Sequence, residues 1–489
     1  MPTNYTNMIQ FAITEFANDG IGLYNELKRI HGIARTSGAS VVYPRRKLLN
    51  LTIPSSSTPI KLSPNTDFNN CVFHVTNTTG TKVDLFSLAP NDEEIQDVTI
   101  VNYSLLRKNA VIQNLTSTPK LIIVTDQNPW TYRSEGGNPP IPVERKDVLY
   151  VTGNVVQNDP IATYDYITSP PDCQYVDVSM EQKSFRNIHV SRTDVSNAVT
   201  NLLEVKYQYN VLIENVFVWT PMQPGENGIY EDECIKIKNS AKIFMNNINF
   251  TYTYSAIYHW GYGIRILNVW NTSISNLTAC NPAKGVMGNE NVNELTVEDS
   301  HLNRVDVHCY GRDITCTNCI FENITNTFHR YNRVSSFFGK LIFIDCTFVS
   351  FLPLRIDSDY NAFTPFDLIL ENCTLNVNSD HKSLVNTETM STLNPRPELH
   401  AKCLPKIIIT NMHLNIPSTV TDFCFIKLLN NDYTYSIHYM NTFIVYVTEY
   451  NQAGSAPVTI YDVNQTVTLT ESLTRITNIS MVYNLVGGS

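Results

Sequence analysis

Three short phrases recur at a fixed spacing in the second half of the chain: Asn318-Cys319, Asp345-Cys346 and Asn372-Cys373. Each follows an apolar, strand-like run, and successive cysteines lie 27 positions apart. A fixed period between about 20 and 50 residues is the sequence mark of a solenoid. Because each repeat reads as strand, polar corner and strand, the sequence predicts an all-β fold, a single-stranded right-handed parallel β-helix. The cysteines are interpreted as an interior stack of small apolar thiols.

The polar corner can be followed along the chain with less regular spacing, as insertions between short strands would produce. Asn and Asp suit such corners because their side chains bond local backbone and tolerate left-handed φ. Stacked on similar neighbours, these side chains can also form a ladder along the axis. The predicted corner residues are Asn187, Asn215, Asn247, Asn276, Asp299, Asn318, Asp345, Asn372 and Asn411.

The composition fits a long solenoid and excludes several classes of partner. With 489 residues and 43% hydrophobic content, the chain can bury a large core, and only 16% of its residues are charged. The net charge of −10 gives no basic surface for nucleic acid. Since no run of 18 or more apolar residues occurs, no membrane span is expected.

No signal peptide is expected, because Met1-Pro2-Thr3-Asn4 opens into an amphipathic segment without a basic or apolar leader region. Eleven cysteines is an odd number with no compact disulfide spacing. Both features indicate synthesis in a reducing cytoplasm. The expected location is a virion or tail protein released by lysis, or an extracellular protein whose leader has been removed.

The pattern divides the chain into three parts. Residues 4–30 carry apolar positions at helical spacing, interrupted by Asp19-Gly20, and a helix there would hide the open first coil. We therefore expect an N-terminal capping helix region at 1–40 and a β-helix at 41–425, with a long Pro/Gly-rich loop around 125–150. Residues 426–489 are expected to form a C-terminal β cap or terminal coils.

The capping region also resembles a known family. The segment Met8-Ile9-Gln10-Phe11-Ala12-Ile13, followed by a strand from Gly38 to Pro44, looks like the start of pectate-lyase-like β-helix proteins. That superfamily contains polysaccharide lyases, polygalacturonase-type hydrolases and phage tailspikes. The resemblance covers roughly residues 5–75 by motif and 185–415 by coil pattern. It implies the fold more specifically than an activity.

Chemistry-bearing residues fall at similar distances before successive corners. In the strand from Arg304 to Cys309, alternation predicts that Arg304, Asp306 and His308 face solvent while Val305, Val307 and Cys309 face the core. Coils about 4.8 Å apart would align these side chains into one stripe. The other expected substrate-binding members are His259, Trp260, Tyr262, His329, Arg333, Arg355 and Asp357. A solvated polar face with local ion pairs is the alternative interpretation.

Two catalytic centres remain open. The strand Asp232-Glu233-Cys234-Ile235-Lys236-Ile237 resembles the Asp-Asp-Cys-Ile-x-Ile strand of polygalacturonase-type hydrolases, and the resemblance would make His259 the histidine of that family. No Asn-Thr-Asp precedes it, however, and His259 stands in Tyr-His-Trp rather than Gly-His-Gly. The favoured centre is Asp306 and His308, with Arg304 orienting substrate.

The expected function is a phage-tailspike-like polysaccharide depolymerase, a hydrolase or a lyase, acting in a groove along the coils. A non-catalytic glycan-binding or structural virion appendage or adhesin is the alternative. A polysaccharide substrate is the expected partner, and the resemblance to tailspikes implies a homotrimer. No cofactor is expected: Ca²⁺ would assist a lyase, but Asp357 and Asp359 are too few ligands for a calcium claim.

Overall fold

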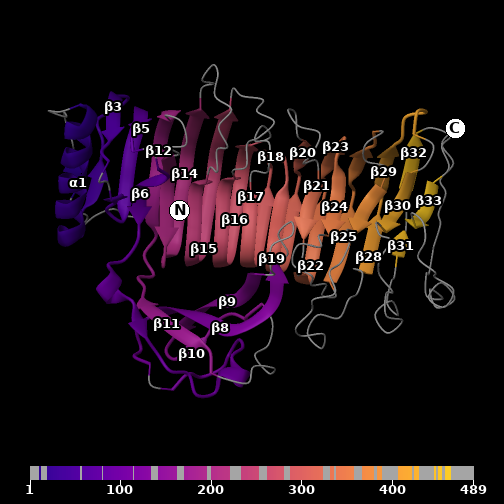
Figure 1. Ribbon diagram of the computed structural model, residues 1–489, viewed down its shortest axis with the longest axis horizontal. Coiled ribbons are helices and arrows are strands. Elements are labelled where there is room, and N and C mark those ends of the chain that lie inside the picture. Colours follow the sequence, from indigo (N-terminus) through magenta and orange to yellow (C-terminus); the bar gives the residue numbers. More distant parts are fainter. Residues whose placement is uncertain are drawn as a thin grey trace.

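The computed structural model describes residues 10–12, 19–55, 58–79, 81–113, 115–133, 141–161, 170–194, 200–220, 233–252, 262–279, 287–322, 331–334, 337–356, 366–378, 383–387, 406–420, 423–428, 445–447, 450–453 and 458–463. Among them lies one α-helix, followed by parallel strands stacked along a single axis (Figure 1). The fold is a right-handed parallel β-helix, as expected from the repeat.

The β-helix strands occur on both sides of a long insertion. Those before it are β1 (Gln10–Ala12), β2 (Ser40–Val42), β3 (Leu48–Ile53), β4 (Ile60–Lys61), β5 (Asn65–Asn77) and β6 (Val83–Leu88). Those after it are β12 (Lys183–Asp194), β13 (Thr200–Lys206), β14 (Tyr209–Thr220), β15 (Glu233–Tyr252), β16 (Tyr262–Ala279), β17 (Met287–Glu298), β18 (His301–Leu302), β19 (Val305–Thr317), β20 (Ile320–Glu322), β21 (Tyr331–Val334), β22 (Phe337–Ile344), β23 (Thr347–Val349), β24 (Leu352–Ile356), β25 (Phe366–Glu371), β26 (Thr374–Asn376), β27 (Ser383–Thr387), β28 (Lys406–Thr410), β29 (Met412–Asn415), β30 (Phe423–Leu428), β31 (Val445–Val447), β32 (Tyr450–Ala453) and β33 (Val458–Val463).

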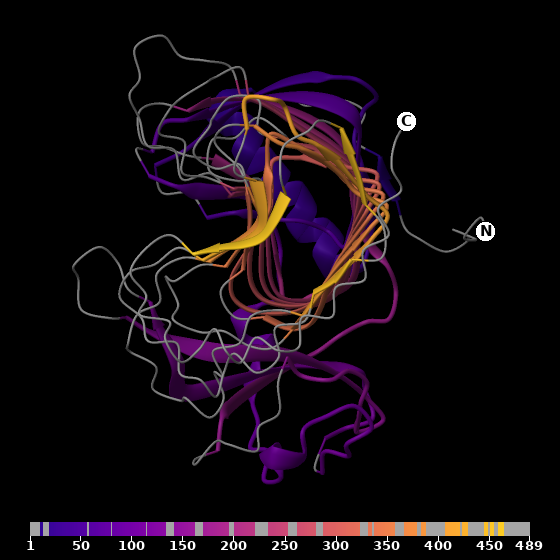
Figure 2. The same cartoon turned by 90° about the vertical axis from the view of Figure 1, so that its right-hand side faces the viewer.

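Each coil has three faces. In one coil β25, β26 and β27 are separate strands, which pair in parallel with β28, β29 and β30 of the next coil. We call the columns that contain β25, β26 and β27 the first, second and third face. Longer strands such as β15 bend around corners and belong to more than one face. Seen along the axis, the coils superpose into one ring around an apolar interior (Figure 2).

The corner prediction is confirmed, because all nine predicted corner residues have positive φ, between 50° and 61°. Their side chains also bond from coil to coil, as in Asn215 Nδ2 to Asn187 Oδ1 at 2.7 Å and Asn411 Nδ2 to Asn372 Oδ1 at 3.0 Å. The cysteines next to these corners are buried thiols, and no disulfide occurs among the described cysteines. The stacked cysteine thiols therefore contribute to packing in the interior of the coils.

The N-terminal cap differs in detail from the expectation. Helix α1 spans Gly20–Ser37, begins at the Asp19 cap and ends at Gly38 with φ 68°. It covers the first coil at one end of the solenoid (Figure 1), with Leu23 and Leu27 buried. Residues Gln10–Ala12, expected to be helical, instead form β1, which pairs with β2. An open parallel edge satisfies its backbone groups by adding a strand, and this preference overrides the helical spacing.

The segment expected as a long loop around 125–150 lies within a small β-domain. Its strands and 3₁₀ turns are η1 (Asp92–Glu94), β7 (Gln96–Asp97), η2 (Tyr103–Leu105), β8 (Lys120–Arg133), β9 (Ile141–Thr152), β10 (Val155–Val156) and β11 (Asp172–Asp177). They form a five-stranded antiparallel sheet that lies against the solenoid (Figure 1). Tyr150 of this domain stacks on Tyr209 of the β-helix, with ring centroids 4.2 Å apart. β8 and β9 pair in antiparallel fashion, and residues 134–140 between them lie outside the described residues.

Beyond residue 425 the coil pattern continues in the described strands. β31, β32 and β33 pair in parallel with β28, β29 and β30. No helix in the described ranges has the length and apolar character needed to cross a bilayer.

Candidate functional site

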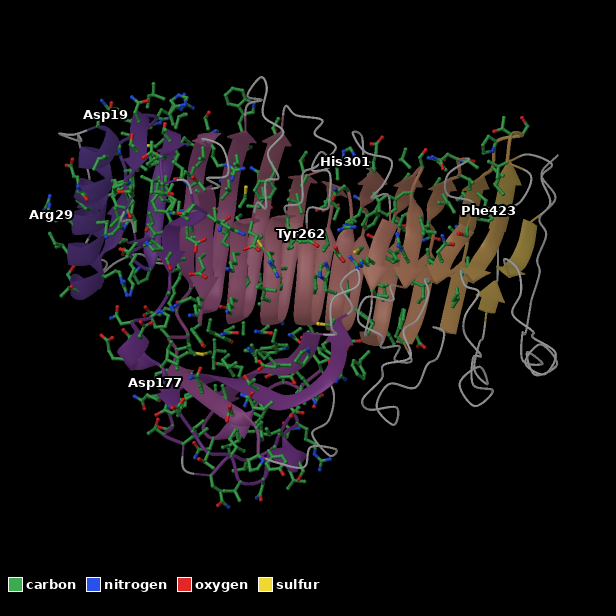
Figure 3. All side chains as sticks on the ribbon, in the orientation of Figure 1. Asp19, Arg29, Asp177, Tyr262, His301 and Phe423 are labelled. Atoms are coloured by element: carbon green, nitrogen blue, oxygen red, sulfur yellow. The ribbon has the colours of Figure 1, made fainter. Side chains whose placement is uncertain are left out.

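A cluster of ionisable side chains lies on the third face, where β16, β17 and β19 run side by side. The Arg304 guanidinium lies 2.7 Å from Asp306 Oδ2, and His308 Nε2 lies 3.1 Å from the same oxygen. The Tyr262 hydroxyl lies 2.7 Å from His308 Nε2 and 3.1 Å from Asp306 Oδ2. We call these four residues the Asp306 cluster. Figure 3 places Tyr262 midway along the solenoid, on the face that looks toward the viewer.

The strand register confirms that the predicted polar side chains align across coils. Asp306 pairs with Arg333 of β21, and Arg333 pairs with Arg355 of β24. Arg333 is buried beside the cluster, and Arg355 is half-buried one coil further on. Glu233 and Tyr262 are likewise paired, between β15 and β16. The corner residues thus provided the correct phase for Asp306 with Arg333 and for Glu233 with Tyr262.

A β-bulge in β19 changes the direction of the side chains. Val307 pairs with Asn289 and Cys309 pairs with Glu290, so that His308 is the extra residue in this strand. Such a bulge re-aims the residues that follow it. The expectation that Cys309 faces the solenoid core is therefore wrong. It packs with Ile161 of the inserted domain and with Tyr310.

Gly288 explains how Tyr262 reaches a residue two coils away. Gly288 lies between Arg265 and Asp306 in the register, on the coil that separates Tyr262 from Asp306. A Cβ built on Gly288 would lie 3.0 Å from three atoms of the Tyr262 ring. Because glycine has no side chain, the ring lies across this coil and brings its hydroxyl to Asp306 and His308. Sequence reasoning missed Gly288, although its lack of a side chain within a strand pattern is a signal of close approach.

The cluster is buried rather than solvent-facing, which corrects the expectation for Arg304, Asp306 and His308. Their relative exposures are 1%, 0% and 7%. The cause is tertiary: the Tyr262 ring packs in from an earlier coil, and Arg333 adjoins from the next. His308 is the most exposed member of the cluster, at 7%, and Arg333 beside it is 9% exposed.

The electrostatics fix the protonation state of two groups. Burial alone would raise the pKa of the Asp306 carboxyl, but Arg304, His308 and Arg333 outweigh it and hold the pKa well below its usual range. Burial and the Asp306 charge raise the pKa of Tyr262 well above its usual value. In the resting protein the cluster therefore contains a carboxylate and a protonated phenol. Asp306 cannot serve as the protonated acid of an inverting hydrolase.

The second predicted centre is a network of ion pairs. Glu233 is buried, with Lys82 at 3.3 Å and Lys236 at 3.6 Å, and it also pairs with Arg265. Burial acts to raise the pKa of Glu233, but Arg265 and Lys82 reverse the effect and lower it. A carboxylate held by three cations is a poor proton donor, which weighs against hydrolysis at this position. Several predicted residues lie outside the described residues: Asp232, His259, Trp260, His329 and Asp357.

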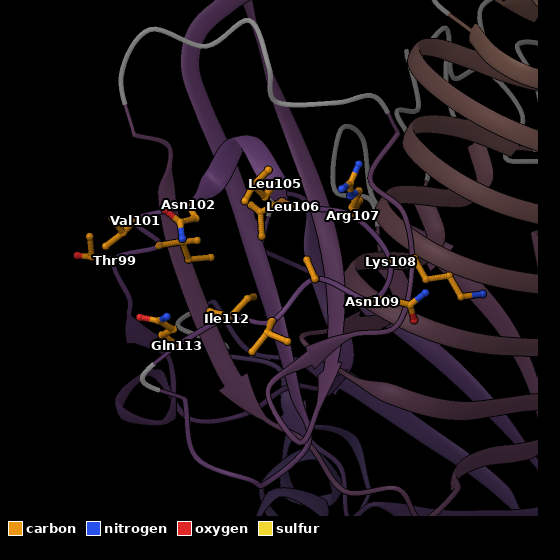
Figure 4. A pocket seen from close by; sticks show the side chains of 13 residues that line it. Thr99, Val101, Asn102, Leu105, Leu106, Arg107, Lys108, Asn109, Ile112 and Gln113 are labelled. Carbon is orange, nitrogen blue, oxygen red and sulfur yellow. The ribbon is translucent and has the colours of Figure 1, made fainter.

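Two other features bear on ligands. In the described part of the chain no group of three or more His, Cys, Asp or Glu residues is placed to hold a metal ion. A hollow of about 330 Å³ lies in the inserted domain, lined by one continuous segment from Thr99 to Gln113 (Figure 4). Its ionisable side chains are Arg107 and Lys108, so it offers no carboxylate or histidine for acid–base chemistry.

Comparison with known proteins finds solved structures with a similar fold. No protein-family model matches the chain, and none of the curated proteins matches its sequence. The tailspike gp49 of Pseudomonas phage LKA1 is 15% identical, over 89% of this chain and 71% of that chain, at a TM-score of 0.49. The tailspike gp61 of Pseudomonas phage phi297 is 13% identical, over 92% and 76%, at a TM-score of 0.45. The family 28 exopolygalacturonase of Yersinia enterocolitica is 10% identical, over 94% and 78%, at a TM-score of 0.33. Similarities of this size do not extend to activity.

Proposed function

We propose that the protein is a polysaccharide depolymerase of the β-helix type, as found on phage tails, and that the Asp306 cluster is its reaction centre. The observation that carries the proposal is the meeting of Arg304, Asp306 and His308 with Tyr262 from another coil. Ionisable groups with strongly shifted pKa values, tied to specific charge partners, concentrate at functional sites.

The chemistry favours elimination over hydrolysis. A glycan lyase needs a base for the proton α to a uronate carboxylate, an acid for the leaving oxygen and a cation for the carboxylate charge. His308 can accept the carbon-bound proton at Nδ1, while Asp306 stabilises the imidazolium through Nε2–H. As the bond to the leaving oxygen breaks and a carbon–carbon double bond forms, Tyr262 supplies a proton to that oxygen. The 2.7 Å contact then lets His308 return a proton to Tyr262.

The substrate contact proposed for Arg333 and Arg355 follows from their register beside Asp306. Guanidinium groups on successive coils would bind successive acidic groups of an extended glycan. The proposal includes this substrate contact. It also includes a location on the virion and assembly as a homotrimer.

The alternative is a binding or structural β-helix that does not cleave glycan. The mutual hydrogen bonding of the cluster favours it, because such a network can tie three coils together. The two functions separate when the full chain is incubated with a panel of acidic and neutral bacterial capsules. The depolymerase is expected to generate reducing ends together with the ultraviolet absorbance of unsaturated uronates, and Asp306→Asn is expected to abolish both. Binding without any product, in the wild-type protein, would exclude the enzyme.

A further inference from the structure

A hollow of about 380 Å³ lies on the second face of the solenoid, where β5, β12, β14 and β15 pass side by side (Figure 1). The Asp306 cluster belongs to the third face, so the two sites are on different surfaces of the coil. Ligand sites in proteins commonly measure about 300–1,000 Å³. This hollow is therefore large enough for a small organic ligand.

Aromatic rings line the hollow in an exposed position. Trp219 is 44% exposed, although an indole is usually well buried. Two residues earlier on the same strand, Phe217 stacks on His189 of the preceding coil, with ring centroids 4.7 Å apart and planes inclined by 13°. Burial lowers the pKa of His189, which keeps its ring neutral at physiological pH.

Each exposed ring has uncharged polar neighbours at the same register. Trp219 lies between Ser191 and Thr251, and Phe217 lies between His189 and Asn249. No carboxylate, lysine or arginine is among the lining residues. The hollow thus alternates apolar rings with neutral donors and acceptors at the spacing of the coils, about 4.8 Å.

This alternation distinguishes between two occupants. A second copy of the chain would need a continuous apolar centre, since polar groups are depleted from the core of a subunit interface. A sugar presents apolar C–H faces and neutral hydroxyl groups in alternation, which is the complement of the lining. An acidic sugar would find no lysine or arginine among the lining residues to balance its charge.

We propose that the Trp219 hollow is a second, non-catalytic binding site for a neutral hexose oligosaccharide. It would hold a neutral stretch of glycan independently of the reaction centre on the third face. The inference therefore goes beyond the proposed cleavage and does not require it.

The test is titration of the full chain with maltohexaose, cellohexaose, laminarihexaose and chitohexaose, followed by tryptophan fluorescence and calorimetry. At least one oligomer is expected to bind, and Trp219→Ala is expected to weaken that binding about tenfold or more. The matched control is Ile320→Ala, an equally exposed apolar residue (42%) of the same face that lies outside the hollow. It should leave the affinity unchanged.

The outcomes separate this site from the depolymerase. Asp306→Asn should leave the binding of the hexose oligomer intact, and Trp219→Ala should leave the turnover of short acidic substrates intact. No Trp219-dependent binding of any of the four oligomers overturns the proposal. A change of oligomeric state in Trp219→Ala, with unchanged sugar affinity, would identify the hollow as a contact between copies instead.

Discussion

Two buried polar clusters in this molecule solve the same problem differently. In the N-terminal cap, His31 is fully buried, accepts a hydrogen bond from Ser63 N–H at 3.2 Å and lies 2.9 Å from the Tyr43 hydroxyl. All three groups are neutral, and burial lowers the pKa of His31 to about 3. In the Asp306 cluster, by contrast, a carboxylate and a guanidinium are buried together.

The contrast indicates that the His31 cluster in the cap only supports the fold. Neutral partners satisfy buried polar groups without the large desolvation cost of ions. The cap shows that this chain can tie a helix to its first coil in that way. The buried charges of the Asp306 cluster carry a desolvation cost that neutral side chains would avoid, and packing of the coils does not require them. This supports a role for the cluster in chemistry.

The largest expected effect concerns activity. His308→Gln should lower glycan turnover about 10²–10⁴-fold, since it removes the proton-transfer group. His31→Gln, the matching change in the cap, should leave turnover unchanged. Initial rates on the same glycan measure both. Equal glycan turnover in His308→Gln and in the wild-type protein would show that both clusters have only a structural role.

Asp306→Asn should reduce the free energy of unfolding by about 3–5 kcal/mol at pH 7, because Arg304 loses its buried partner. The pKa of Asp306 is lower in the folded state than its ordinary value, so its contribution is complete above about pH 4 and declines as the pH falls. The difference in free energy of unfolding between variant and wild type should decrease by about 1 kcal/mol per pH unit below pH 4. Urea unfolding at pH 7 and pH 3 measures this gap, and a constant value would contradict the charged pair.

The cap should show its own pH dependence in a different window. Because the folded-state pKa of His31 is about 3 and the unfolded value is 6.5, the unfolded chain binds more protons between these values. Wild-type stability should fall as the pH drops through this window, by about 2 kcal/mol at pH 5. In His31→Gln this component should be absent. Parallel thermal unfolding curves from pH 7 to pH 5 for both proteins would refute a neutral buried histidine.

Gly288→Ala should reduce the free energy of unfolding by about 1–3 kcal/mol, because the new methyl group meets the Tyr262 ring. It should also lower turnover by moving the Tyr262 hydroxyl away from His308. Gly32→Ala in α1 is the control in the cap, where a Cβ meets nothing within 4 Å. It should stabilise the protein slightly. Full turnover in Gly288→Ala would show that the position of Tyr262 has no catalytic role.

The sequence alone determined the scaffold and the phase of its side chains. The corner residues adopt left-handed φ and stack on one another through local preferences that each Asn or Asp carries by itself. From those corners, the alignment of Asp306 with Arg333 followed correctly.

Only the tertiary structure decided where those side chains point. The bulge at His308, the passage of Tyr262 over Gly288 and the contact of Cys309 with the inserted domain each depend on residues from other coils or from another domain. Period and alternation describe one strand at a time, whereas these features arise when several strands are brought into register. The sequence therefore predicted a polar stripe, and packing across coils made it a buried cluster.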